Sequence, residues 1–351
     1  MLTEKQLKEI REHLENAKNP IFFFDNDADG LASFLVLQRF IGRGRGVSLK
    51  GLPSLNKSYY KKAEDFNSDY IFVLDRPGVD DEVVELNKKG KNLPIVCIDH
   101  HKLDGEPNIE NYYNTNLESG KSEPTSYLCY KATGKKEDMW LAVIGCLGDW
   151  YIPEFFEDFK KKYPELVSYP YKNPADIVYK TELGKIIMIL NLSMKDTTTN
   201  VVILYKYLMN AKGPKDILEE NAKTKSFLER YEFLNKTVKK MVEKAEQDID
   251  RKNKFLFFTY SGDMSLSQHI SDELMSKHSD LRIAVGFIKG GYVKFSLRGE
   301  KIRTIMMDAM KDIEGAKGGG HEFSCGAQMN AEHIDVFKKN LLQEIKVFED
   351  D

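Results

Sequence analysis

The feature that most constrains the fold is an apolar run, residues 21–24, that ends in three aspartates at alternate positions: Asp25, Asp27 and Asp29. The run is typical of a buried strand, and strand alternation places the three carboxylates on one face. At about 6 Å and an effective dielectric of about 20, each like-charge pair costs roughly 3 kcal/mol. A bound cation offsets this cost, and a cluster of oxygen donors favours Mg²⁺ or Mn²⁺. The alternative is a solvated turn with Asp29 as the N-cap of the next helix.

The composition indicates a globular chain long enough for two domains. It has 351 residues, of which 41% are hydrophobic and 30% charged, with a net charge of -3. The acidic balance argues against a dedicated nucleic-acid binder, but bound cations would cancel several acids locally. No segment approaches the roughly 18 apolar residues of a membrane span, so we expect no membrane association. The four cysteines lack the spacing of a disulfide framework or zinc site, which fits a reducing, cytoplasmic location.

The first half of the chain alternates strands and helices. Apolar strands are expected at residues 21–25, 47–50, 70–74 and 93–98, with helical patterns before and between them, the first capped by Thr3. This alternation predicts an α/β fold with a parallel sheet covered on both faces. Helices are then expected at 125–132, 139–147 and 181–209, whereas 153–174 is expected to be an irregular surface insertion.

A second, smaller α/β domain is expected near the C-terminus. Residues 215–250 are predicted to form a long charged helix that connects the domains. Strands are expected at 255–260, 282–288 and 292–298, the last two joined by a hairpin at Gly290 and Gly291. The expected domains are 1–210, a connector at 211–252, and 253–351.

Acids follow three of the expected strands of the first domain. Asp75 follows the third strand, and Asp99, His100 and His101 follow the fourth, while Asp149 ends a buried helix. Parallel strands bring such ends to one edge of the sheet, and carboxylates with imidazole suit a pair of Mn²⁺ or Mg²⁺ ions. Taken alone, Asp75 is better explained as the cap of a turn, and Asp149 as the cap of the segment before Trp150. Two adjacent histidines are more commonly part of a surface turn. Their occurrence at successive strand ends favours the metal site.

These motifs resemble those of the DHH phosphoesterase superfamily. The resemblance rests on Asp27-Ala28-Asp29-Gly30, Asp75, Asp99-His100-His101 and Gly148-Asp149, with Gly319-Gly320-His321 and Gly326 in the C-terminal DHH-associated domain. Leu74-Asp75-Arg76-Pro77 and Gly148-Asp149-Trp150 look most like the archaeal RecJ-like nucleases. The resemblance implies a parallel-sheet DHH domain, a smaller α/β domain, and an active site in the cleft between them.

The resemblance also implies residue roles. Asp75 would bridge two ions, Asp99 would orient His100, and His101 would contact the scissile phosphate. The metal ligands would be Asp25, Asp27, Asp29, Asp75, His100 and Asp149, holding two Mn²⁺ ions or Mg²⁺ in their place.

Substrate contacts are expected from the second domain. Gly318, Gly319 and Gly320 would let a loop approach an anion closely, and His321 would bind a terminal phosphate or stack on a base. Arg298 would donate a two-pronged contact to a phosphate. The alternative for the glycines is a flexible loop.

The function implied is a Mn²⁺-dependent exonuclease on single-stranded DNA or RNA, with a role in DNA replication or repair and a replisome factor or helicase as a partner. A second hypothesis is an enzyme for short oligonucleotides, phosphoadenosine phosphate or cyclic dinucleotides, and inorganic pyrophosphatase is a further option. A replisome scaffold is a third, although every expected ligand is present. Polarity and oligomeric state stay open.

Overall fold

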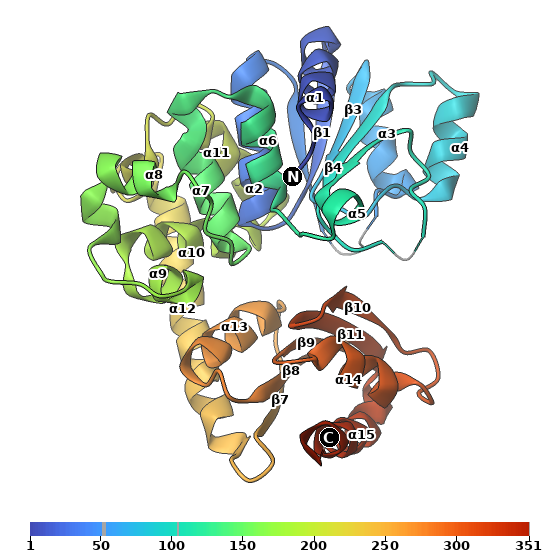
Figure 1. The fold of residues 1–351 in the computed structure, drawn as a ribbon, viewed down its shortest axis with the longest axis vertical. Coiled ribbons are helices and arrows are strands. Elements are labelled where there is room, and N and C mark those ends of the chain that lie inside the picture. Colours follow the sequence, from blue (N-terminus) through green and yellow to red (C-terminus); the bar gives the residue numbers. More distant parts are fainter. Residues whose placement is uncertain (51–53, 104, 351) are drawn as a thin grey trace. The chain divides into compact units, whose positions relative to one another are not determined.

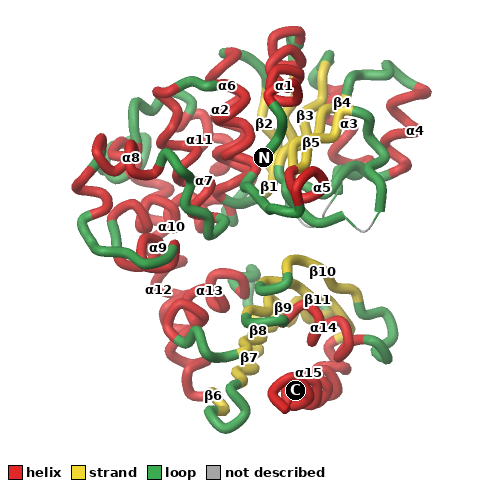
Figure 2. The backbone as a smooth tube through the Cα atoms, viewed as in Figure 1, coloured by secondary structure: helices red, strands yellow, loops and turns green. Residues whose placement is uncertain are grey.

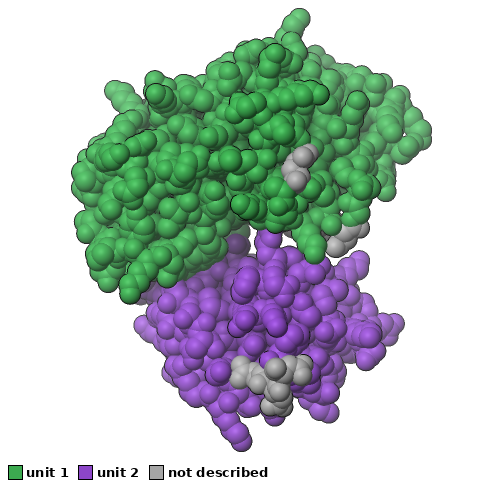
Figure 3. Space-filling view, in the orientation of Figure 1, with its two compact units in different colours: residues 1–231 green, residues 232–351 purple. Residues whose placement is uncertain are grey.

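In the computed structural model, the described residues are 1–50, 54–103 and 105–350. They form two compact units, Met1–Tyr231 and Glu232–Asp351, which are coloured separately in Figure 3. The boundary falls within helix α12 (Lys225–Ala245), inside the segment expected to connect two domains.

A five-stranded parallel sheet forms the centre of the first unit, in the order β2-β1-β3-β4-β5 (Figure 1). The strands are β1 (Pro20–Asp25), β2 (Arg45–Leu49), β3 (Tyr70–Leu74), β4 (Ile95–Asp99) and β5 (Asn111–Asn114). The register pairs Phe24 with Leu74 and Leu74 with Ile98. The carboxyl ends of β1, β3 and β4 therefore lie side by side at one edge of the sheet, as predicted from the acids at these strand ends.

Both faces of this sheet are buried. On one face Phe24 stacks on Phe34 of α2 (Ala28–Ile41), with ring centroids 4.8 Å apart. On the other face Ile21 and Phe23 share a core with α3 (Lys57–Asp65) and α4 (Asp81–Lys89). Burial on both sides explains why the strands are continuously apolar. Helix α1 (Glu4–Asn16) begins at the predicted cap, Thr3, which accepts a hydrogen bond from the backbone of Gln6.

Further helices of the first unit follow β5 in the chain (Figure 1). They are α5 (Thr115–Ser119), α6 (Thr125–Thr133), α7 (Met139–Gly148), α8 (Phe156–Lys162), α9 (Pro174–Lys180), α10 (Glu182–Met194) and α11 (Thr198–Leu208), with short 3₁₀ turns at Lys136–Asp138, Pro164–Val167 and Pro214–Ile217. The prediction of an irregular surface insertion at 153–174 was wrong. Phe156 and Phe159 of α8 are fully buried, so tertiary packing stabilises a helix too short to form alone.

The second unit is a six-stranded sheet in the order β10-β11-β9-β8-β7-β6 (Figure 2). Its elements are β6 (Ile249–Asp250), β7 (Phe255–Ser261), α13 (Ser267–Lys277), β8 (Arg282–Lys289), β9 (Tyr292–Arg298), α14 (Ile302–Met310), β10 (Lys317–His321), β11 (Ser324–Asn330) and α15 (Ile334–Asp350), with 3₁₀ turns at Glu246–Asp248 and Ala331–His333. The predicted hairpin between β8 and β9 is confirmed. Gly290 and Gly291 have φ of 60° and 79°, as a two-residue turn requires.

The glycine run is a strand, not the predicted loop. Gly318 pairs with Ala327 and Gly320 with Cys325, so β10 forms one edge of the second sheet. A β-carbon on Gly318 would lie 2.6 Å from Met310 Cε, and one on Gly320 would lie 2.8 Å from Cys325 Cα. One on Gly319 would meet nothing within 4 Å. Close packing therefore explains two of the three glycines.

Among the helices of the described residues, none combines the length and the apolar character that crossing a bilayer requires.

Candidate metal centre

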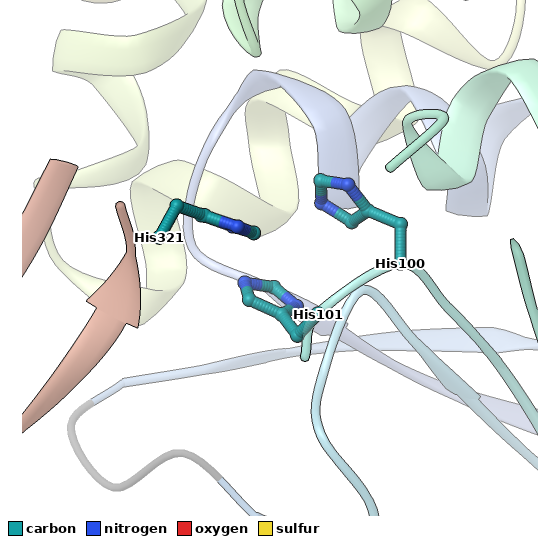
Figure 4. Close-up of side chains that lie close together, drawn as sticks. All are labelled: His100, His101 and His321. Carbon is teal, nitrogen blue, oxygen red and sulfur yellow. The ribbon is translucent and has the colours of Figure 1, made fainter. Parts of the chain in front are cut away.

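The six predicted metal ligands all lie in the first unit, at the carboxyl edge of its sheet. Asp25 ends β1, and Asp27 and Asp29 lie at the start of α2. Asp75 follows β3, His100 follows β4, and Asp149 directly follows α7. Figure 4 shows the rings of His100 and His101 side by side after β4. Their centroids are 4.8 Å apart.

Asp75 belongs to three groups of possible ligand atoms in the described part of the chain, two of which consist only of predicted metal ligands. Oxygens of Asp29, Asp75 and Asp149 lie within 4.8 Å of one another and of a ring nitrogen of His100. Oxygens of Asp25, Asp27 and Asp75 form a second such group. A carboxylate common to two groups is what a pair of bridged cations requires.

The electrostatics of the groups fit a cation. Burial raises the pKa of Asp27, Asp29 and Asp75, and repulsion from neighbouring carboxylates raises it further. Burial alone would lower the pKa of His100, but hydrogen bonds with Asp149 (2.9 Å) and Asp75 (3.3 Å) raise it well above its usual value. In the metal-free protein, these raised pKa values favour proton uptake by the carboxyls. A divalent ion would replace those protons.

Local backbone geometry holds the acids in place. Asp75 has φ of +61°, a left-handed conformation that Asp and Asn tolerate better than most residues. Asp27 is the N-cap of α2, and its carboxylate accepts a hydrogen bond from the Gly30 backbone at 2.9 Å. The predicted alternative of Asp29 as the cap is therefore wrong. Gly30 is needed here, because a β-carbon would lie 2.6 Å from the Asp25 backbone.

Asp29 instead accepts hydrogen bonds from the first residues of α6. The backbone N–H groups of Thr125 and Ser126 donate to its two oxygens at 2.7 and 3.1 Å, and the Ser126 hydroxyl also donates. Thr125 Oγ1 in turn donates to Asp75 Oδ1 at 3.2 Å. The helix N-terminus thus stabilises the charged form of Asp29 and fixes the orientation of its oxygens.

The loop after β1 is held by Asn191 of α10 and by Lys195, the C-cap of that helix. Neither residue was predicted from the sequence. Asn191 Oδ1 accepts from the backbone N–H of Ala28 at 2.8 Å, and Lys195 Nζ donates to the carbonyl of Asn26 at 3.1 Å. A single asparagine within the otherwise apolar run of α10 was the available signal.

Asp25 has a basic partner that lies distant in sequence. Arg76 Nη2 donates to Asp25 Oδ1 and, at 2.9 Å, to the carbonyl of Leu49. The backbone of Asn26 donates to the same Asp25 oxygen. Two hydrogen bonds therefore occupy Oδ1, and Oδ2 is the oxygen with which Asp25 would bind a cation.

The predicted partner of Asp99 was wrong. Its Oδ1 lies 2.7 Å from Nδ1 of His101, whereas His100 Nδ1 lies 2.8 Å from Ser122 Oγ. Tyr112 and Asn114 donate to the other Asp99 oxygen at 2.8 and 3.2 Å. Burial lowers the pKa of His101, but the Asp99 carboxylate outweighs it and raises that pKa to about 9. His101 is thus an imidazolium at neutral pH, held by a buried carboxylate.

The predicted substrate residues lie in the second unit. Arg298 is buried, and its Nε donates to Asp272 Oδ1 at 2.5 Å, so much of its guanidinium serves an internal ion pair. Gly318, Gly319, Gly320 and His321 lie in β10. Their contact with substrate stays a prediction.

Comparisons with known proteins agree with this fold. Residues 252–347 match the DHHA1 domain family. The structure resembles RecJ from Thermus thermophilus in complex with Mn²⁺, with a TM-score of 0.72 and 14% identity over 98% of this chain and 55% of that one, so the chain spans about half of that protein. It also resembles an exonuclease RecJ bound to manganese, with a TM-score of 0.68 and 15% identity over 98% of this chain and 95% of that one. A third match is the pGpG-specific phosphodiesterase PggH from Vibrio cholerae, with a TM-score of 0.51 and 13% identity over 94% of this chain and 99% of that one. No curated protein sequence matches the chain.

The structural matches identify the fold. The two-domain α/β fold is that of RecJ and related DHH proteins, as the strand-end acids predict. The chain therefore has the fold of RecJ and related DHH proteins, and residues 252–347, in its second unit, match the DHHA1 domain family.

Proposed function

We propose that this chain is a divalent-metal-dependent phosphodiesterase that removes nucleoside monophosphates from an end of single-stranded DNA or RNA. The observation that carries the proposal is Asp75, whose carboxylate belongs to both groups of predicted metal ligands. The RecJ-like fold supports the same chemistry by analogy. One histidine among the donors favours Mn²⁺ over Mg²⁺.

Residues of the first unit would bind the two metal ions and contact the phosphate. Asp29, Asp75, His100 and Asp149 would hold one ion, and Asp25, Asp27 and Asp75 the other. When bound, the pair supplies an activated water and neutralises charge on the phosphate. His101 has a ring nitrogen within 4.8 Å of an Asp75 oxygen, so its positive charge lies beside the proposed metal pair. From there His101 donates a hydrogen bond to a phosphate oxygen and stabilises the transition state, while Asp99 keeps it protonated.

End-labelled single strands test the proposal. Each end is labelled in turn, in DNA and RNA versions, and release of mononucleotides is measured with Mn²⁺, with Mg²⁺ and with a chelator. The wild-type protein should release mononucleotides only with metal, and Asp75→Asn and His100→Ala should each lose at least about a hundredfold in rate.

Asp158→Asn is the matched control, because Asp158 pairs only with exposed Lys161 on α8 and lies in no ligand group among the described residues. It should behave as wild type. Metal-dependent release at the wild-type rate by Asp75→Asn would refute the mechanism.

A second candidate keeps the chemistry but has short substrates: dinucleotides, phosphoadenosine phosphate or cyclic dinucleotides. It is favoured by the match to a pGpG-specific phosphodiesterase along 99% of that protein. Hydrolysis of pGpG much faster than of a long strand at equal concentration would select it. A role in DNA replication or repair, and a replisome factor or helicase as a partner, stay predictions from the resemblance.

A further inference from the structure

A groove with a cavity volume of about 530 Å³ runs along the outer edge of β2, the edge strand of the first sheet. Its walls come from β2, the end of α3 and the exposed side of α11. Lys62 and Lys206 stand on opposite walls, the half-buried ring of Phe66 lies in one wall, and Tyr205 is buried against Phe34 at the base of the other. Nothing in the proposed chemistry uses this groove.

The groove is strongly cationic. Arg45, Lys50, Lys62 and Lys206 all line it, and its lining as described contains no acidic side chain. Throughout the described parts of the chain, neither Lys62 nor Lys206 forms an ion pair. The Arg45 guanidinium lies 4.6 Å from the centroid of the Phe66 ring, which orients it across the groove. On a protein with a net charge of -3, such a one-signed groove is suited to an anion.

The spacing of the cations favours a polyanion over a single phosphate. Arg45 and Lys50 lie at the two ends of the β2 segment, and five residues of extended chain span about 16 Å. A site for one phosphate needs its donors to converge within a few ångströms. Positive charges distributed along both walls are typical of a surface that follows a nucleic-acid backbone.

The groove leads to the metal centre. Ser48 of its lining donates to Asn26 Oδ1 at 2.9 Å, and Asn26 lies between Asp25 and Asp27. Lys50 has two charged neighbours at this end of the groove: the Asp196 carboxylate, which attracts it, and Lys195, which binds Asn26 and repels Lys50 more weakly. Lys50 and Lys195 therefore connect the groove to the loop that carries the acids, with Asp196 beside them.

We propose that this groove binds the phosphodiester backbone of a single strand whose end lies at the metal centre. The inference rests on the proposed function and names a second binding surface for the same substrate. Bound nucleotides beyond the one being cleaved would raise affinity for long strands and leave short substrates unaffected.

The test compares Lys62→Glu/Lys206→Glu with two controls: Lys62→Arg/Lys206→Arg, which keeps the charge, and Lys8→Glu/Lys88→Glu, which makes the same charge change at exposed sites on α1 and α4. Affinity for a fluorescent single strand is measured by anisotropy in chelator, and hydrolysis of a dinucleotide and of a long strand is measured with Mn²⁺. The groove variant should bind the strand about tenfold more weakly, with a salt slope smaller by about 1.4 for two lost contacts. Its dinucleotide hydrolysis should match wild type, and both controls should bind as wild type does.

Unchanged strand affinity in the groove variant would overturn the inference, as would an equal loss on the dinucleotide. Binding of an acidic polypeptide in preference to the strand would assign the groove to a protein partner and also overturn it. Absence of hydrolysis in wild type would refute the proposed function, but the metal-free binding measurement would still decide on the groove.

Discussion

Replacing Asp75 by Asn should stabilise the metal-free protein while abolishing its response to metal. Asp75 is 1% exposed and sits among the carboxylates of both ligand groups. Asn has nearly the same shape, tolerates φ of +61°, and can still accept the Thr125 hydrogen bond. The substitution therefore removes a negative charge with little other change.

The magnitude follows from the distances. Oxygens of Asp75 and its acidic neighbours lie within 4.8 Å, where each ionised pair costs about 3.5 kcal/mol at an effective dielectric of about 20. Partial protonation and the attraction of His100, 3.3 Å away, offset part of the sum. We expect a net gain of about 2–4 kcal/mol in the free energy of unfolding, or roughly 5–10 °C in Tm for a unit of this size.

The pH dependence has a definite sign. The folded-state pKa values of Asp27, Asp29 and Asp75 are raised, so the folded protein binds more protons than the unfolded chain. Their destabilisation is fully present above the raised values and disappears as the pH falls toward the ordinary value of about 4. Metal-free wild type should thus gain stability as the pH falls through the raised values toward about 4, and Asp75→Asn should gain less.

Thermal unfolding followed by circular dichroism, in chelator and with Mn²⁺, measures these effects, with Asp158→Asn as the control. Wild type should gain Tm with Mn²⁺, and the variant should not. A metal-free variant no more stable than wild type, or one that keeps the full gain from Mn²⁺, would show that the carboxylates do not repel one another as argued.

Three further predictions concern neighbouring residues. Asp99→Asn should return the pKa of His101 from about 9 toward its ordinary value. As the pH rises, the variant should therefore lose activity at a lower pH than wild type does. A pH–rate profile and an NMR titration of the metal-free protein would detect this shift. Gly319→Ala should fold normally, whereas Gly320→Ala should lower the Tm of the second unit, because only the latter places a β-carbon against backbone; equal loss of stability would contradict the packing argument. Asn191→Ala should weaken Mn²⁺ binding about tenfold in calorimetric titration, and unchanged affinity would show that the loop after β1 needs no support from α10.

The carboxyl edge of the first sheet was predictable from the sequence because two local signals coincide there. Each of three apolar strands ends in an acid, and parallel pairing brings successive strand ends together. The observed register, with Phe24 opposite Leu74 and Leu74 opposite Ile98, satisfies that expectation. Neither signal depends on tertiary detail.

The wrong predictions of secondary structure concern segments whose conformation depends on tertiary contacts. Phe156 and Phe159 support a seven-residue helix only through burial, so local propensity gave no sign of α8. The glycines of β10 have poor strand propensity, and their conformation depends on pairing with β11.

The exchange of partners between the two histidines shows what local sequence leaves open. Asp99 precedes both, and its carboxylate could pair with either ring. The choice is made by Ser122, which lies 2.8 Å from His100 Nδ1 after an intervening strand and helix, and by Tyr112 and Asn114, which fix the second Asp99 oxygen from β5. With His100 held by Ser122, its Nε2 is directed to Asp75 and Asp149. Asp99 is then free to pair with His101 and favour its protonated form, so adjacent residues of one segment supply a metal ligand and a cation at neutral pH.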